Sequence, residues 1–192
     1  MQVARVIRLL PLLLLLVAVQ GCVALVAAGG ATAVMSAHDR RTVGAQLDDQ
    51  NIELKIGTAI TADERLKGVH VNATSFNGIV LLTGETPTGE QRDLVLNATR
   101  TIRGIRRTVN EIRVAPPTNG ASRSHDTWLT SKVKTKLLTV EKLDSSQVKV
   151  VTENSAVYLM GLLKRDEAEL ATSAATDVDG VERIVKLFEY ID

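Results

Sequence analysis

The stretch Asn77-Gly78-Ile79-Val80-Leu81-Leu82-Thr83-Gly84 has a counterpart 77 residues further along the chain, in Asn154-Ser155-Ala156-Val157-Tyr158-Leu159-Met160-Gly161. The correspondence continues on both sides of this stretch. Apolar positions fall on apolar positions with a shift of 77 residues upstream and 76 downstream: Ile52, Ile56 and Ile60 on Leu129, Val133 and Leu137, then Leu94, Ala98 and Ile102 on Leu170, Ala174 and Val178. A long internal repeat indicates one structural unit that is used twice.

Each copy has the pattern helix, strand, strand, helix, strand. In the first copy, Ile52, Ile56 and Ile60 recur at helical spacing, and Asp48 or Asp49 can cap the amino end of that helix. We expect Thr127 to be the corresponding cap in the second copy.

The remaining elements follow in the same order. Residues 69–73 alternate between apolar and polar, and Asn77-Gly78 predicts a two-residue hairpin turn. Thr88 and Gln91 match a capping box at the start of the second helix, and residues 109–114 predict the last strand. The expected fold class is therefore α+β, with two helices packed on a three-stranded sheet in each copy.

Proline, glycine and small polar residues at 116–122 indicate a linker between the copies. We expect the first domain to span residues 46–115, the linker 116–124 and the second domain 125–192.

The amino-terminal residues predict export. Arg5 and Arg8 precede an apolar run over residues 9–19, which is too short to span a bilayer and is typical of a secretory signal at 1–21. Cys22 is the only cysteine, so it has no disulfide partner within the chain. We expect residues 22–45 to form a tether whose composition cannot build a core.

Two features of the sequence resemble known families. Residues 19–22, Val-Gln-Gly-Cys, resemble the lipobox of bacterial lipoproteins, which implies cleavage before Cys22 and its acylation, although Gln20 is bulkier than the residue usual there. Two acyl chains already give stable anchoring on a membrane. Gly78, Val80, Leu82 and Gly84, together with the helix that ends in Gly104-Ile105, resemble the BON domain; in the second copy the pattern is Val157, Leu159 and Gly161, with Ser155 in place of the first glycine.

Together, the lipobox and two BON-like units resemble the dual-BON-domain outer-membrane lipoproteins of Gram-negative bacteria. The resemblance implies a non-catalytic protein that binds phospholipid, supports envelope integrity and is found at division sites. It also implies attachment to the outer membrane on its periplasmic side, because Val23 is not the aspartate that retains lipoproteins at the inner membrane.

Composition and motifs argue against other functions. Without residues 1–21 the chain has 21 basic and 22 acidic side chains, which does not fit a nucleic-acid-binding domain. We expect His38, His70 and His125 to be ordinary surface histidines, with no metal site, no cofactor and no catalytic residue. The run Arg100, Arg103, Arg106 and Arg107 is either a solvated helix end or a contact for headgroups or an acidic partner.

The two copies differ most in their first helix, where Asn51 of copy one corresponds to Trp128 of copy two. On a helical wheel Trp128 lies off the buried stripe, close to Lys132 and Thr139, and Leu138 lies on the flank beyond Thr135. Residues 128–142 contain four lysines against Glu141, whereas residues 125–192 as a whole have nine basic and twelve acidic side chains. Tryptophan favours the headgroup level of a bilayer, and basic residues favour anionic lipid.

We therefore predict a lipid-binding site of Trp128, Lys132, Thr135, Lys136, Leu138 and Thr139, for anionic phospholipids such as phosphatidylglycerol and cardiolipin. Three alternatives stay open. Trp128 could pack against the other domain or the linker, or it could be a hot spot for an outer-membrane assembly or division protein that the chain recruits as a periplasmic adaptor. A hydrolase with an unrecognised site is the third.

Overall fold

The computed structural model describes residues 39–192, so the predicted signal sequence, Cys22, His38 and most of the predicted tether lie outside the described residues. The described chain repeats one unit twice. The first unit consists of α3 (Val43–Ala62), the short 3-10 helix η2 (Glu64–Leu66), β1 (His70–Phe76), β2 (Ile79–Thr86), α4 (Gly89–Arg100), β3 (Arg107–Asn110) and β4 (Arg113–Val114). The second consists of α5 (Gly120–Leu138), η3 (Ser145–Gln147), β5 (Lys149–Glu153), β6 (Ala156–Leu163), α6 (Arg165–Thr176) and β7 (Arg183–Tyr190).

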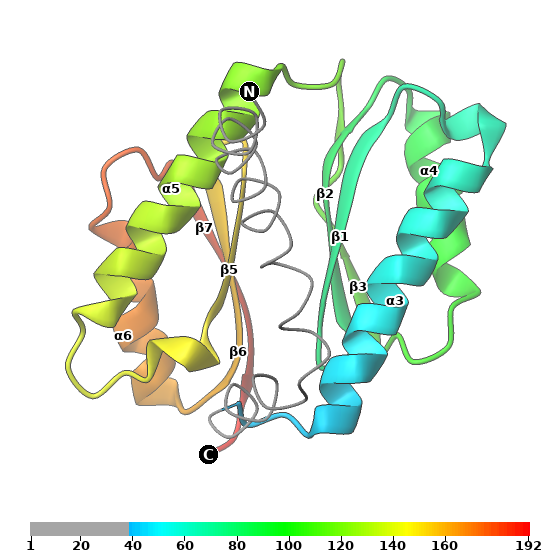
Figure 1. Cartoon of the computed structure of the whole chain (residues 1–192). Helices are drawn as coiled ribbons and strands as arrows, with labels where there is room; N and C mark the ends of the chain where they lie inside the picture. Colours follow the sequence, from blue (N-terminus) through cyan, green and yellow to red (C-terminus); the bar gives the residue numbers. More distant parts are fainter. Residues whose placement is uncertain (1–38) are drawn as a thin grey trace, which may run out of the picture. The chain divides into compact units, whose positions relative to one another are not determined.

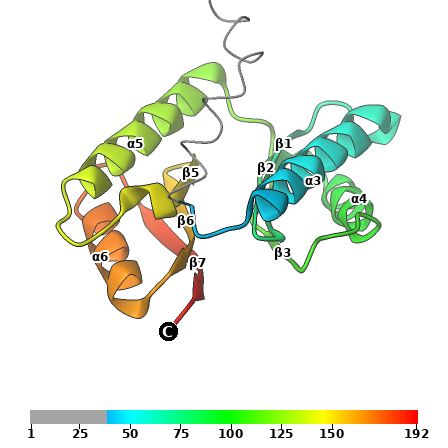
Figure 2. The ribbon, with the colours of Figure 1, turned by 60° about the horizontal axis from the view of Figure 1, so that its bottom comes forward.

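Each unit has the same layered arrangement. The central strand pairs antiparallel with the strand before it and parallel with the strand after the second helix, in the orders β1-β2-β3 and β5-β6-β7. In each unit both helices cover one face of the sheet (Figures 1 and 2). The predicted α+β class and element order are confirmed, with a short 3-10 helix added after the first helix of each unit.

The last strand of the first unit differs from the continuous β7 of the second. The predicted strand at 109–114 is divided into β3 and β4, both parallel to β2. The cause is local, because the Asn110 side chain accepts a hydrogen bond from the Ile112 amide at 3.1 Å and Ile112 turns into the core. The strand resumes at Arg113.

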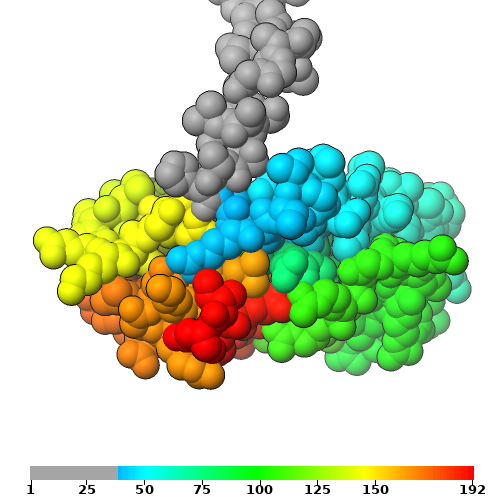
Figure 3. Space-filling view, turned by 90° about the horizontal axis from the view of Figure 1, so that it is seen from below, coloured from blue at the N-terminus to red at the C-terminus, as the bar shows by residue number. Residues whose placement is uncertain are grey.

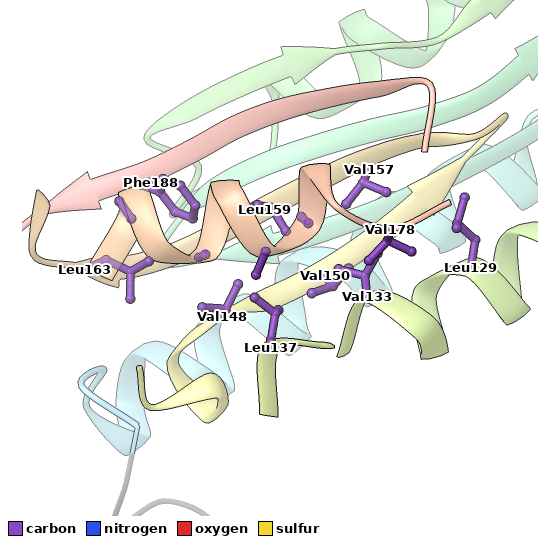
Figure 4. Packing of buried hydrophobic residues seen from close by; sticks show 14 residues of the cluster. Leu129, Val133, Leu137, Val148, Val150, Val157, Leu159, Leu163, Val178 and Phe188 are labelled. Atoms are coloured by element: carbon purple, nitrogen blue, oxygen red, sulfur yellow. The ribbon is translucent and has the colours of Figure 1, made fainter. Parts of the chain in front are cut away.

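The repeated apolar positions form the two interiors. Ile52 and Ile56 of α3 pack against Val80 and Leu82 of β2, together with Val95 of α4. The second interior contains the corresponding residues of α5, β5 and β6, as the labelled side chains of Figure 4 show: Leu129, Val133, Leu137, Val148, Val150, Val157, Leu159, Leu163, Val178 and Phe188.

A buried aspartate joins the first helix to the hairpin turn in both units. Asp49 accepts hydrogen bonds from the hydroxyl of Ser75 (2.6 Å) and from the amides of Asn77 (2.6 Å) and Gly78 (2.8 Å). Arg41 also donates to it at 2.8 Å. Our expectation that Asp48 or Asp49 caps the helix was therefore wrong, because Asp49 lies within α3 and serves the turn instead.

Asp126 does the same in the second unit. Its two carboxylate oxygens accept the amides of Asn154 and Ser155, both at 2.9 Å. These amides are free to point at the helix because the turn residues have positive φ, 49° at Asn154 and 58° at Ser155. The two-residue hairpin turn that the sequence predicts is thus present in both copies and is held from the helix side.

The first helix begins inside the predicted tether of residues 22–45. Thr42 caps α3 by accepting the Ala45 amide at 3.1 Å. Immediately before it, Arg40 donates to both carboxylate oxygens of Glu167, at 2.6 and 2.7 Å, and to the Leu162 carbonyl at 2.8 Å. Figure 3 shows this blue start of the described chain against the yellow and orange segments of the second unit. The prediction of a tether is wrong for residues 40–45, because these contacts fix them.

The predicted linker is also shorter than 116–124. Asn119 caps α5, since its side chain accepts the Ser122 amide at 3.0 Å, and the helix starts at Gly120. Thr127 lies inside this helix and is not its cap. Thr88 does cap α4 through the Gln91 amide at 3.2 Å, but the Gln91 side chain donates to the Arg65 carbonyl at 2.9 Å, so the predicted capping box is not closed.

The faces of the two sheets that carry no helices pack on each other. A third apolar cluster joins Phe76, Ile79 and Leu81 of the first unit to Ala156, Tyr158, Met160 and Leu187 of the second. Ion pairs border it, between Arg183 and Glu111 (2.6 Å) and between Arg106 and Glu189 (2.8 Å). Both faces of β2 and β6 are consequently buried, which explains their continuous apolar runs.

Among residues 39–192, the helices are either too short or too polar to cross a bilayer.

The buried aspartate predicts a large and specific loss of stability. We expect Asp49→Ala to lower the free energy of unfolding by about 2–4 kcal/mol, because it leaves buried amides of the turn without an acceptor. Urea unfolding followed by circular dichroism measures this. The neighbouring Asp48 is exposed and is the matched control, for which Asp48→Ala should cost less than about 0.5 kcal/mol. Equal losses in the two variants would contradict the role of Asp49.

Candidate functional site

The packing of α5 decides which of its side chains are free. Leu129, Val133 and Leu137 are at most 1% exposed and face the sheet. Residues spaced three and four apart lie on one face of a helix, so a second stripe that starts at Trp128 faces away from the core. The outer face of α5 is therefore available for contacts.

Trp128 stands on this outer face with 53% of its surface exposed. The prediction that its indole faces solvent is confirmed. Its ring contacts come from its own helix, with the Lys132 ammonium 4.5 Å from the indole centroid and the His125 ring 5.6 Å away. The cluster between the two sheets contains Tyr158 and Phe76 but not Trp128, so inter-domain packing does not account for the tryptophan.

A groove of about 500 Å³ runs beside the indole along α5. Five of the six predicted site residues line it, namely Trp128, Lys132, Thr135, Lys136 and Thr139. Leu138 does not line the groove. It is 73% exposed on an adjacent flank of the helix. We name the groove and Leu138 together the α5 surface.

The opposite wall of the groove comes from residues that the sequence reasoning missed. Asp177, Val178 and Asp179 follow α6 and face the lysines of α5. Lys132 donates to the Asp179 carbonyl at 2.9 Å, and the Lys136 ammonium lies 3.8 Å from the Asp177 carboxylate.

One signal in the sequence could have located this wall. Gly180, which the repeat aligns with Gly104, has a φ of +99°. A side-chain carbon at this position would lie 3.6 Å from the Leu129 side chain. The glycine therefore marks a turn that passes close to α5.

The groove combines apolar area with mobile cations. Both lysines hold contacts at the protein surface, where an ion pair is worth about 0–1 kcal/mol and exchanges readily for another anion. An amphipathic ring, two ammonium groups and threonine hydroxyls form a surface for a ligand that has an anionic head beside an apolar body. No pair of acid and base suited to catalysis lines this groove in the described chain.

The histidines correct one prediction. His125 is exposed, as expected. His70 was expected on the polar surface of a strand without a carboxylate at ligand spacing, but its Nδ1 lies 3.1 Å from the buried Glu85 carboxylate, and Glu153 completes a cluster with them. Sequence spacing could not reveal this, because the three residues come from three different strands.

The arginine run is divided between roles. Arg106 donates to the Asn77 carbonyl at 3.0 Å and pairs with Glu189 of the second unit, so it holds the two units together. Arg100 donates to the Asn97 side chain at 3.0 Å within α4. The run is thus not one uniform solvated helix end.

Comparisons with known proteins agree with the duplicated fold. The BON domain model matches residues 48–116 and 125–192. The chain is 38% identical over 174 residues to the outer membrane lipoprotein DolP of Haemophilus influenzae, covering 90% of both chains. It is 33% identical to a 21 kDa hemolysin of Actinobacillus pleuropneumoniae, covering 80% of this chain and 79% of that one. It is 26% identical to osmotically-inducible protein Y of Escherichia coli, covering 74% and 72%. The chain therefore belongs to the BON domain family, as a dual-BON protein of the outer-membrane lipoprotein type.

Proposed function

We propose that the protein binds anionic phospholipid through the α5 surface of its second BON domain. The observation that carries this proposal is the half-exposed indole of Trp128, flanked by Lys132 on the side of the helix that faces away from the core. Tryptophan partitions to the level of the headgroups, where its ring is half in hydrocarbon and half in water. A soluble domain without such a ligand has little reason to expose its only tryptophan.

The charges around the indole support an anionic headgroup. Each lysine near an anionic surface contributes about 1 kcal/mol. Lys136 can exchange the 3.8 Å contact with Asp177 for a lipid phosphate, because both side chains are largely exposed and their pairing is weak. Lys132 keeps its ammonium over the indole and next to the groove, where it can meet a phosphate that lies against the ring.

Leu138 gives the α5 surface its most exposed apolar side chain. Burying a leucine side chain contributes about 1.5–3 kcal/mol. We propose that Leu138 enters the outer part of the acyl region while Trp128 stays at the headgroups. Phosphatidylglycerol and cardiolipin are the ligands that this combination of apolar area and cations suits.

Attachment to the membrane is proposed to come from Cys22, which lies outside the described residues. An outer-membrane lipoprotein among the relatives supports acylation at this position and a location on the periplasmic face of the outer membrane. An acylated amino terminus raises the local concentration of headgroups around the folded domains. Weak binding by the α5 surface is then sufficient to orient the protein on the bilayer.

At the level of the cell, we propose a role in envelope integrity, with enrichment at division sites where anionic lipid gathers. The matched families are non-enzymatic, which supports binding over catalysis. The alternative is a periplasmic adaptor that uses Trp128 as a hot spot for an outer-membrane assembly or division protein. Binding to protein-free vesicles distinguishes the two.

Substitution of the tryptophan tests the proposal. We expect Trp128→Glu in a soluble fragment of residues 39–192, which contains both hydrophobic cores, to weaken binding to phosphatidylglycerol vesicles by at least about tenfold. Vesicle flotation measures the bound fraction. Leu54→Glu is the matched control, because Leu54 is 69% exposed on α3 and receives the same charge; it should bind as wild type. If the wild-type fragment ignores these vesicles, or Trp128→Glu binds equally well, the proposal is wrong.

The lysines predict a dependence on charge and salt. We expect Lys132→Gln combined with Lys136→Gln to weaken binding about 30-fold, since two contributions of about 1 kcal/mol each are lost. Lys55→Gln combined with Lys67→Gln removes the same charge from exposed positions of the first domain and should change little. Wild-type binding should also fall between 50 and 500 mM salt, as screening shortens the range of the attraction. Binding that is insensitive to salt and to the α5 lysines would point to purely apolar adsorption.

Anchoring has its own test. Cys22→Ala in the full-length chain should abolish incorporation of radiolabelled palmitate and shift the protein from the membrane fraction to the soluble periplasmic fraction. The reason is the loss of acyl chains, each methylene of which contributes about 0.8 kcal/mol. Palmitate labelling that persists in Cys22→Ala would place the modification elsewhere.

A further inference from the structure

Three ionisable side chains meet where the two BON domains join. His70 of β1 and Glu85 of β2 are direct partners in the antiparallel register, and Glu153 at the end of β5 reaches them from the second domain. One ligand atom from each residue lies within 4.8 Å of those of the other two. Glu85 and Glu153 are 2% and 7% exposed, so both carboxylates are buried.

Neutral groups surround these carboxylates. Glu85 accepts hydrogen bonds from the Asn154 side chain at 2.5 Å and from the amide and hydroxyl of Thr118 at 3.1 and 3.2 Å. Glu153 accepts the Asn72 side chain at 3.1 Å. Within residues 39–192, neither carboxylate forms an ion pair with a lysine or an arginine. Two buried negative charges are therefore opposed by one imidazole, which is costly unless a further cation compensates them.

The carboxyl groups respond differently to this environment. Burial raises the pKa of Glu153, and the hydrogen bond from Asn72 only partly offsets it. For Glu85, burial also acts to raise the pKa, but the hydrogen bonds from Asn154, Thr118 and His70 outweigh burial and hold the pKa below its ordinary value. A buried carboxylate that is kept ionised beside a neutral imidazole is a pair of metal-ligand groups in their binding forms.

The cluster is open to ions from one side. A polar groove of about 300 Å³ is lined by His70, Glu153 and Asn72 from the cluster and by Thr130 and Asp126 of α5. The ligand atoms are thus buried enough to hold an ion away from bulk water and yet have an entry path.

We propose that His70, Glu85 and Glu153 bind one divalent transition-metal ion, with Zn²⁺ as its representative. One imidazole nitrogen and two carboxylate oxygens are three protein ligands of the kind that zinc accepts, and water or a groove side chain supplies the fourth. The Nδ1 of His70 and the Oε2 of Glu85 are 3.1 Å apart, close to the separation of about 3.3 Å between two ligands of one tetrahedral zinc ion. Magnesium and calcium, which demand six or more oxygens, fit this set poorly.

The ion would join the two domains. Two of its ligands belong to the sheet of the first domain and one to the sheet of the second, so binding replaces a repulsion between carboxylates across the domain boundary with a bridge. The competing arrangement is a protonated His70 that balances one carboxylate and leaves no place for a metal ion.

Calorimetry and thermal unfolding of the chelator-treated fragment of residues 39–192 distinguish the two. We expect one Zn²⁺ per chain and a rise in Tm of about 5–10 °C at zinc concentrations a hundredfold above Kd, with no comparable rise in magnesium. His70→Ala and Glu153→Gln should each weaken zinc binding by at least about tenfold. His125→Ala is the control, because His125 is the other histidine of this fragment and is exposed; it should bind zinc as wild type does.

A measurement on the unaltered chain guards against variants that fail to fold. In nitrogen-15 NMR spectra of the imidazole rings, zinc should shift the nitrogens of His70 and leave those of His125 in place. No Tm rise with zinc, equal zinc affinity in Glu153→Gln, or a shift confined to His125 would each overturn the proposal.

Discussion

The apolar contact between the two sheets constrains everything else in this protein. Phe76, Ile79 and Leu81 pack on Ala156, Tyr158 and Met160, so the face of each sheet that its helices leave open is covered by the other domain. Burial at about 25 cal/mol per Å² makes such a contact the main favourable contribution to the joining of two small domains. Because both sheet faces are occupied, a binding surface can form only on the outer sides of the helices and at the edges of the domain boundary.

Duplication fixed the interior and left the exterior free to diverge. Asp49 and Asp126 hold the same turn in the two copies, and Ile52 and Leu129 occupy the same core position. One residue before that core position the copies part, at Asn51 and Trp128. The exchange costs the fold little because the position faces solvent in both copies. It gives only the second domain a ring and adjacent lysines on its outer face, so the two copies have one architecture and unequal surfaces.

Local patterns were sufficient for the elements, the repeat and the exposure of Trp128, because helical and strand periodicity report which side of an element is buried. They failed where side chains act over long sequence distances. Asp49 looked like a cap because it precedes the apolar stripe, yet its acceptors serve a turn 28 residues away. His70 and Glu153 are 83 residues apart in the chain and meet only after the two sheets pack. Arg40 looked like part of a tether because its partner Glu167 lies 127 residues further on.

The depth of the Trp128 side chain in a bilayer is the most direct test of a lipid-facing α5. Trp128 is the only tryptophan, so its fluorescence reports this one site. Phosphatidylglycerol vesicles with bromine atoms at the upper acyl carbons should quench the emission of the bound protein more strongly than vesicles brominated near the chain ends. Emission that is unchanged by either lipid, in protein that floats with the vesicles, would show that another surface makes the contact.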